Sequence, residues 1–115
     1  MTDSQELLQG TLELLVLKAL SLEPMHGWGI AKRIDQLSDG VFSVQQGSLY
    51  PGLQRMVRKG WVRSEWRVTE NNRRARYYVL TAAGRRQLGP SRSLWMRSSE
   101  AVNRILNAEL DPEGA

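Results

Sequence analysis

The chain has 115 residues, one histidine and no cysteine, which allows one domain with a modest core and excludes disulfides, thiol nucleophiles and thiolate metal sites. Residues 1–50 hold three basic residues against six acidic ones, whereas residues 51–115 hold thirteen against six. Twelve of those thirteen are arginines, which suit bidentate contact with phosphates and guanine edges, although a solvated basic face is the alternative. No secretory leader or apolar run of about 20 residues is evident, so we expect a cytoplasmic protein without a membrane segment.

The first expected helix, over residues 6–20, is apolar on two faces. One face carries Leu8, Leu12, Leu15 and Ala19, and the other carries Leu7, Leu14, Val16 and Leu17. A surface helix of a monomer needs only one apolar stripe. We therefore expect a partner subunit to cover the second face, with a central core helix of a monomer as the alternative.

A turn over residues 23–27 leads to a second expected helix over residues 28–37. The third expected helix begins near Gln46, because Pro51 is tolerated only within the first turns, and it ends at the left-handed cap that Gly60 favours. Its apolar face carries Leu49, Leu53, Met56 and Val57, and its polar face carries Gln54, Arg55, Arg58 and Lys59.

Two strand-like segments follow, over residues 61–68 and 76–80, with a polar loop over residues 69–75 between them. Two strands around a polar turn form a hairpin. Its arms and tip carry Arg63, Arg67, Arg73, Arg74 and Arg76. Three helices followed by a basic hairpin is the order of a winged helix-turn-helix, in which the third helix enters the major groove of DNA. The fold class expected is therefore mainly α with a small β-hairpin.

Several motifs occur together in this chain in a fixed order. They are residues 10–20, His26-Gly27-Trp28, the Leu-Tyr-Pro-x-Leu block from Leu49, Lys59-Gly60-Trp61-Val62, and the Tyr-x-Leu-Thr-x-x-Gly block from Tyr78. In this order they resemble the PadR family of bacterial transcriptional regulators, over nearly the whole chain. The resemblance implies a homodimeric winged-helix repressor whose C-terminal helix packs against the first helix of its partner. The short tail resembles the small subgroup of that family.

Gly89 and Pro90 lie where the C-terminal helix of the family runs on without a break. Proline is well placed in the first turn of a helix and poorly placed in its interior. We therefore expect two helices, over residues 81–88 and 90–109, with a break or kink at residues 89–90. Thr81 is the expected N-cap of the first of them.

The expected domains are a winged helix-turn-helix domain over residues 6–80 and a dimerisation segment over residues 81–110. The expected interface residues are apolar and lie on the first and last helices: Leu8, Leu12, Leu15, Leu94, Trp95, Val102, Ile105 and Leu106. Trp95 has two interpretations. Either it fills the dimer core or, as the resemblance implies, it flanks a pore between subunits that stacks a small aromatic effector.

The N-terminal end of the third helix is expected to read bases, because Gln and Ser hydrogen-bond to base edges and Leu meets a thymine methyl. Leu49 and Tyr50 fit the core as well as they fit DNA. Arginines of the helix and the hairpin are expected to contact the DNA backbone or the minor groove, where they position the protein rather than specify sequence. The expected DNA-binding residues are Gln45, Gln46, Ser48, Leu49, Tyr50, Arg55, Arg58, Arg73, Arg74 and Arg76.

Other kinds of site find little support in the sequence. His26 has no second histidine or cysteine for a metal pair or a dyad, so we expect it to cap the second helix or to touch a phosphate. The chain has no phosphate-binding glycine loop, HExxH motif or nucleophile elbow. We therefore expect no enzyme, metal or cofactor. The expected partner is double-stranded DNA with a palindromic operator, bound by a homodimeric repressor that a small molecule or other signal relieves; the alternative is a winged helix that binds proteins or RNA.

Overall fold

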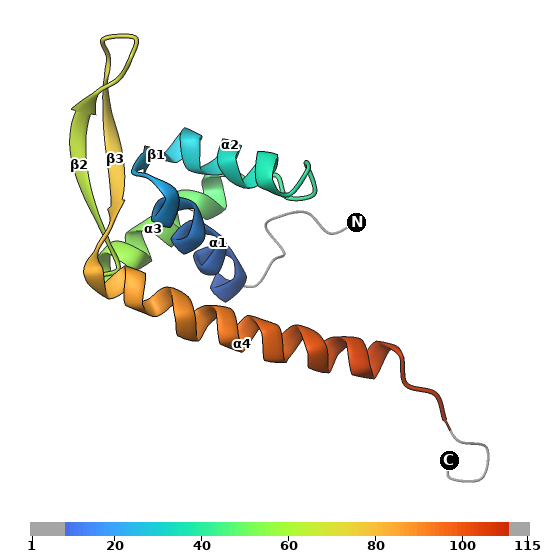
Figure 1. The fold of residues 1–115 in the computed structure, drawn as a ribbon. Coiled ribbons are helices and arrows are strands. Elements are labelled where there is room, and N and C mark those ends of the chain that lie inside the picture. Colours follow the sequence, from blue (N-terminus) through green and yellow to red (C-terminus); the bar gives the residue numbers. More distant parts are fainter. Residues whose placement is uncertain (1–8, 111–115) are drawn as a thin grey trace.

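The structure, a computed structural model, describes residues 9–110 (Figure 1). Its elements in chain order are α1 (Gln9–Leu22), β1 (Met25–His26), α2 (Gly27–Leu37), α3 (Gln46–Arg58), β2 (Val62–Val68), β3 (Arg74–Leu80) and α4 (Ala82–Leu106). The expected fold class is confirmed: three helices and a hairpin form a winged helix-turn-helix, and one long helix follows it. We call β2, β3 and their connecting loop the wing.

The first helix, α1, lies at the centre of the fold and contacts α2, α3, α4 and β3 of the same chain (Figure 1). On its second apolar face, Val16 and Leu17 are buried within the chain and Leu14 is half-buried, whereas Leu7 lies outside the described residues. The expectation that a partner subunit covers part of this helix stays a prediction. Leu12 is only 5% exposed, so little of its side chain is left for the dimer interface predicted for it. Leu15 is partly buried against the same core, whereas Leu8 lies outside the described residues.

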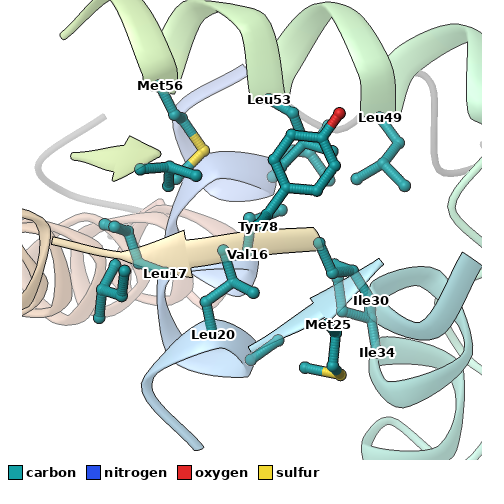
Figure 2. Close-up of a cluster of buried hydrophobic side chains, with 14 residues drawn as sticks. Val16, Leu17, Leu20, Met25, Ile30, Ile34, Leu49, Leu53, Met56 and Tyr78 are labelled. Carbon is teal, nitrogen blue, oxygen red and sulfur yellow. The ribbon is translucent and has the colours of Figure 1, made fainter. Parts of the chain in front are cut away.

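The core forms where α3 faces α1 and the sheet. In Figure 2, Leu49, Leu53 and Met56 point from α3 towards the centre of the fold. They belong to one buried cluster with side chains from the other elements: Val16, Leu17, Leu20, Met25, Ile30, Ile34 and Tyr78. Each fully buried aliphatic side chain contributes about 1.5–3 kcal/mol. This burial fixes the rotation of α3 about its axis and therefore decides which of its side chains face solvent.

Two side chains predicted or suspected to cap helices do so. The His26 Nδ1 accepts a hydrogen bond of 3.0 Å from the backbone N–H of Gly29 and thereby caps α2. The Thr81 Oγ1 accepts one of 3.0 Å from Gly84 and caps α4. The same hydroxyl donates to the carbonyl of Gly60 at 2.6 Å, so the end of α3 and the start of α4 are tied together.

Gly60 and Gly84 make this joint possible in different ways. Gly60 has φ +78°, as expected for the left-handed cap of α3. A β-carbon on Gly84 would overlap the carbonyl oxygen of Trp61 and lie 2.7 Å from Leu80 Cδ1, so only glycine lets α4 pack this closely on the sheet corner.

The sheet has three antiparallel strands in the order β1-β3-β2, one more than the sequence predicted. Residues 23–27 were expected to form only a turn, but Met25 pairs with Tyr78 and His26 with Tyr77. A strand of two residues is too short to show the alternation from which strands are predicted. The two longer strands confirm the predicted hairpin, with β3 beginning at Arg74 rather than at residue 76.

The last helix, α4, is a single helix of 25 residues with Pro90 inside it, about 37 Å long at the usual rise (Figure 1). The expected separation into two helices at Gly89 and Pro90 is wrong. Proline forfeits one backbone hydrogen bond, here to the carbonyl of Arg86, and crowds the β-carbon of the preceding residue. The preceding residue is glycine, which has no β-carbon, and both positions are exposed, so water can serve the free carbonyl.

Candidate nucleic-acid interface

The solvent face of α3 follows from the burial of its opposite face. Gly47, Pro51, Gln54 and Arg58 recur at helical spacing and are all exposed. The helix begins at Gln46, so Pro51 falls in its first two turns, as expected. Gln54 lies in the middle of this exposed line and was not among the predicted DNA-binding residues, although its place on the polar face was recognised.

The predicted base-reading residues divide into two groups. Gln45 and Gln46 are exposed at the start of α3, Ser48 is half-buried, and Tyr50 is 39% exposed. Leu49 is 1% exposed and belongs to the core, so its predicted contact with a thymine methyl is wrong. The physical reason is its position opposite the solvent line of the helix, where it packs with Leu53 and Tyr78 (Figure 2).

Arg55 is not a freely available cation, because it is bound to a buried carboxylate. Glu13 of α1, with a side chain only 6% exposed, lies 3.2 Å from Arg55 Nε and 2.9 Å from Lys59 Nζ. Arg55 lies in the last turn of α3, and Lys59 is the C-cap residue that follows it. The ion pairs therefore connect the candidate reading helix to the centre of the fold. The predicted DNA contact of Arg55 stays a prediction, whereas Arg58 is exposed one turn away.

A cleft of about 330 Å³, which we call the wing cleft, separates the start of α3 from the wing. Its lining includes Tyr50, Tyr78, Trp28 and the three predicted arginines Arg73, Arg74 and Arg76. The fold thus brings these arginines to the same opening as Tyr50, although they are more than 20 positions apart in the sequence. Burial raises the pKa of the Tyr78 phenol, and the nearby Tyr50 phenol raises that pKa further, so Tyr78 is neutral there at ordinary pH.

The face of the wing on which Tyr78 lies also carries the exposed Trp66 and two arginines, Arg74 and Arg76. Trp66 pairs with Arg76 across the strands, and its ring lies 4.7 Å from the Arg76 guanidinium carbon and 5.2 Å from that of Arg74. Arg76 also donates to Ser64 Oγ at 2.8 Å. These contacts hold two cations in place without neutralising them. Trp66 was missed at the sequence level, although its alternation with Ser64 and Val68 places it on this face.

On the opposite face of the wing, the positive charge of Arg63 and Arg67 is partly neutralised by Glu65. Glu65 is hydrogen-bonded to Arg67 at 2.7 Å and to Arg63, and these two bonds lower the pKa of its carboxyl group. One carboxylate between two arginines leaves this face less positive than the side of Trp66 and the wing cleft, where no ion pair of Arg74 or Arg76 occurs among the described residues.

The model of the transcriptional regulator PadR-like family matches residues 16–90, which cover α2, α3, the wing and parts of α1 and α4. The chain belongs to this family. Among solved structures, this PadR-like chain is similar to a PadR family transcriptional regulator from Eggerthella lenta, with 30% identity, a TM-score of 0.71 and coverage of 87% of this chain and 85% of that one. It is also similar to a PadR-like transcriptional regulator from Bacillus cereus, with 27% identity, a TM-score of 0.73 and coverage of 90% and 99%.

A transcriptional regulator from Clostridium thermocellum has the same fold, with 22% identity, a TM-score of 0.75 and coverage of 83% of this chain and 92% of that one. The family is one of transcriptional regulators, which agrees with the winged helix-turn-helix and its basic wing. Among residues 9–110, no group of three or more metal-ligating side chains was found, and no helix is long and apolar enough to cross a membrane.

The last helix of this PadR-like regulator carries an uncovered apolar seam. The five residues predicted there are all about half exposed or more: Leu94, Trp95, Val102, Ile105 and Leu106. The helix packs against α1 and β3 of the same chain, and its C-terminal part extends away from the other elements (Figure 1).

Proposed function

We propose that this chain is a homodimeric repressor that binds a palindromic operator in double-stranded DNA and is released by a small molecule or another signal. The observation that carries the proposal is the wing cleft, whose lining includes both Tyr50 near the start of α3 and three arginines of the wing. A reading helix and a basic hairpin on one side of the molecule suit a major groove and the backbone beside it. In this proposal, residues 6–80 bind DNA, residues 81–110 form the dimer, and the protein works in the cytoplasm.

The residues of the interface take different roles. We assign base reading to Gln45, Gln46, Ser48 and Gln54, because Gln and Ser hydrogen-bond to base edges. Tyr50 lies between the helix and the wing, where its hydroxyl suits a phosphate. Arg58 and the arginines of the wing are assigned to contacts with the DNA backbone. Such contacts position the protein on the duplex without specifying sequence.

The seam of α4 supports the dimer. Solvated apolar side chains at heptad-like spacing are typical of a helix that packs against another helix. Burying a large apolar side chain contributes about 1.5–3 kcal/mol, so five of them suffice for a stable contact. Trp95 belongs to this seam at 48% exposure, and a gap between two such rings would accept a small aromatic effector. Replacement Ile105→Glu should yield monomers in analytical ultracentrifugation, whereas Arg104→Glu, its exposed neighbour off the seam, should not.

Selection of bound DNA from a random pool is the decisive experiment. A palindromic product would give dimer symmetry and half-site spacing together. A product without repeated half-sites would contradict the dimeric operator, and failure to bind duplex DNA at all would favour a winged helix that recognises protein or RNA.

The wing assignment has its own test in the salt dependence of binding. Replacing both Arg73 and Arg74 by Ala should weaken binding to every DNA sequence and lower the slope of log K against log salt by about one for each lost phosphate contact. The exposed pair Arg97 and Arg104 on α4 gives a matched control. A loss confined to the selected operator would show that the wing reads bases, and no loss would refute its role.

A further inference from the structure

A second cleft, which we call the α2 cleft, has a volume of about 350 Å³ and is not used by the proposed DNA interface. Its lining includes Glu23, His26, Trp28, Lys32, Arg33 and Tyr77. Tyr77 lines this cleft and Tyr78 lines the wing cleft, and neighbouring residues of a strand point to opposite faces of the sheet. The two clefts therefore open on opposite faces of β3.

Three aromatic rings form much of the wall of the α2 cleft. The rings of His26 and Tyr77 make an edge-to-face contact with their centroids 5.4 Å apart. The ring of Trp28 is tilted relative to that of His26, with a centroid distance of 6.2 Å. Trp28 is 60% exposed, an uncommon state for the largest apolar side chain. These rings offer flat surfaces against which another ring can stack.

The cleft also offers positive charge. Arg33 is paired with Glu23 at 2.6 Å, whereas no ion pair of Lys32 occurs among the described residues. The Lys32 ammonium lies 4.8 Å from the centroid of Trp28, so the charge and the ring belong to one surface. Because the Nδ1 of His26 accepts from Gly29, the hydrogen of the neutral imidazole is on Nε2, which makes that atom a second donor.

We propose that the α2 cleft binds a flat aromatic anion, with its ring against Trp28 and Tyr77 and its negative group at Lys32. The volume lies in the range of small-molecule sites, and a few polar groups beside aromatic walls are typical of such sites. Aromatic carboxylates and nucleoside monophosphates share this chemistry.

The α2 cleft and the wing cleft have His26 and Trp28 in common. A ring that stacks on Trp28 from one side biases the rotamer of a side chain that also walls the cleft beside Tyr50 and the wing arginines. Occupancy of the α2 cleft therefore changes the affinity for DNA, and DNA changes the affinity for the anion by the same factor. This coupling rests on the proposed DNA-binding function, whereas the binding itself does not.

Calorimetric titration of the full chain without DNA tests the binding. The probes are 2-naphthoate, adenosine monophosphate and, as an uncharged control, 2-naphthalenemethanol. We expect saturable binding of one anion per chain, weaker by about tenfold in Lys32→Gln, the loss of roughly one charge-assisted hydrogen bond. Trp28→Ala should weaken it as well. Both side chains are exposed, so the variants should keep the circular dichroism of the parent, and Lys18→Gln is the matched control.

The probe that binds identifies the source of the anion: naphthoate alone indicates a carboxylate, and the nucleotide alone indicates a phosphate. Absence of binding by both probes would overturn the proposal. So would equal binding of the uncharged analogue, or binding that survives Lys32→Gln and Trp28→Ala but disappears in Trp95→Ala, because that pattern places the ligand on α4.

Titration of the selected operator with and without the saturating probe then tests the coupling. A shift in operator affinity that Trp28→Ala abolishes supports it, and an unchanged affinity overturns the coupling alone. If the chain binds no DNA, the proposed function fails instead, while the calorimetric result stands.

Discussion

The hydroxyl of Tyr50 lies directly over Gly27, where an added β-carbon would come within 2.5 Å of that oxygen and 2.7 Å of Cζ. This contact seats the start of α3 against the start of α2 and directs the Tyr50 ring along the wall of the wing cleft. Gly27 lies in α2 and does not have a positive φ, so its backbone conformation does not require glycine. Glycine is needed at this position because the Tyr50 phenol occupies the space of a β-carbon.

Replacement Gly27→Ala should displace the Tyr50 ring without unfolding the protein. The clash falls on the far end of a partly exposed side chain that can swing away, and Ala is favoured over Gly in a helix by up to about 1 kcal/mol. We expect the free energy of unfolding in urea to change by no more than about 1 kcal/mol, while operator affinity falls.

Two variants make that comparison specific. Gly47→Ala, where nothing lies within 4 Å of the added carbon, should leave the packing between α2 and α3 unchanged. The double variant Gly27→Ala with Tyr50→Ala should show no further loss of operator affinity beyond Tyr50→Ala alone. A large loss of stability in Gly27→Ala would contradict the view that Tyr50 yields first.

Glu13 pairs with Arg55 of α3 and with Lys59, the C-cap residue of that helix. Replacement Glu13→Gln removes the charge but keeps the shape, and the free energy of unfolding should fall by about 1–3 kcal/mol. The loss stays below that of a fully buried pair, because Arg55 and Lys59 retain 27% and 43% side-chain exposure and can turn to water.

The same variant should bind non-specific DNA more tightly, because two basic side chains near α3 are released. Filter binding to random duplex at low salt would show this, with Glu100→Gln, an exposed position on α4, as the control. Weaker non-specific binding would mean that Glu13 orients the two cations towards DNA rather than withholding them.

The sequence predicted what depends on local pattern. The limits of α3 followed from a single apolar face, a proline near its start and Gly60 after its end. The side-chain caps of His26 and Thr81 followed from their positions before a helix. The pairing of Glu13 with Arg55 and Lys59 did not, because these residues lie 42 and 46 positions apart and only the packing of α1 on α3 brings them together.

Two further differences show where local rules yield to tertiary structure. The apolar faces of α1 indicated more than one covering element, and within the chain α4 is one of them, a contact between the two ends of the fold that no local pattern predicts. Leu49 fitted both DNA and the core at the sequence level, and only the observed packing decides for the core. Each arginine of the wing cleft was predicted to bind DNA, but the sequence did not predict that these arginines share a cleft with Tyr50.

The Tyr78 phenol should make stability depend on pH in the alkaline range. Its pKa is raised above the ordinary value of 10.0, chiefly by burial, so the native state favours the neutral phenol. The stabilising contribution is therefore complete below pH 10 and is lost as pH rises through the higher native pKa. Urea unfolding at a series of pH values above 10 should show a steeper fall for the parent than for Tyr78→Phe.

Tyr77→Phe is the matched control, because the neighbouring phenol lies on the other face of β3 and is only partly buried. It should leave the steep part of the curve unchanged. If Tyr78→Phe and the parent lose stability in parallel above pH 10, the burial of Tyr78 does not control this transition.

Pro90 lies in the interior of α4, where proline is less favourable than other residues, and the helix is nevertheless continuous. Alanine in a helix interior is favoured over proline by about 3 kcal/mol, and the greater freedom of the unfolded chain offsets roughly 0.4–1 kcal/mol of this. Pro90→Ala should therefore raise the free energy of unfolding by about 2 kcal/mol at equal protein concentration. Ser93→Ala, one turn further along the exposed surface, should change it by a few tenths of a kcal/mol. A loss of stability in Pro90→Ala would show instead that the proline bends α4 into a path that the dimer requires, and ultracentrifugation of the same variant would then reveal weaker association.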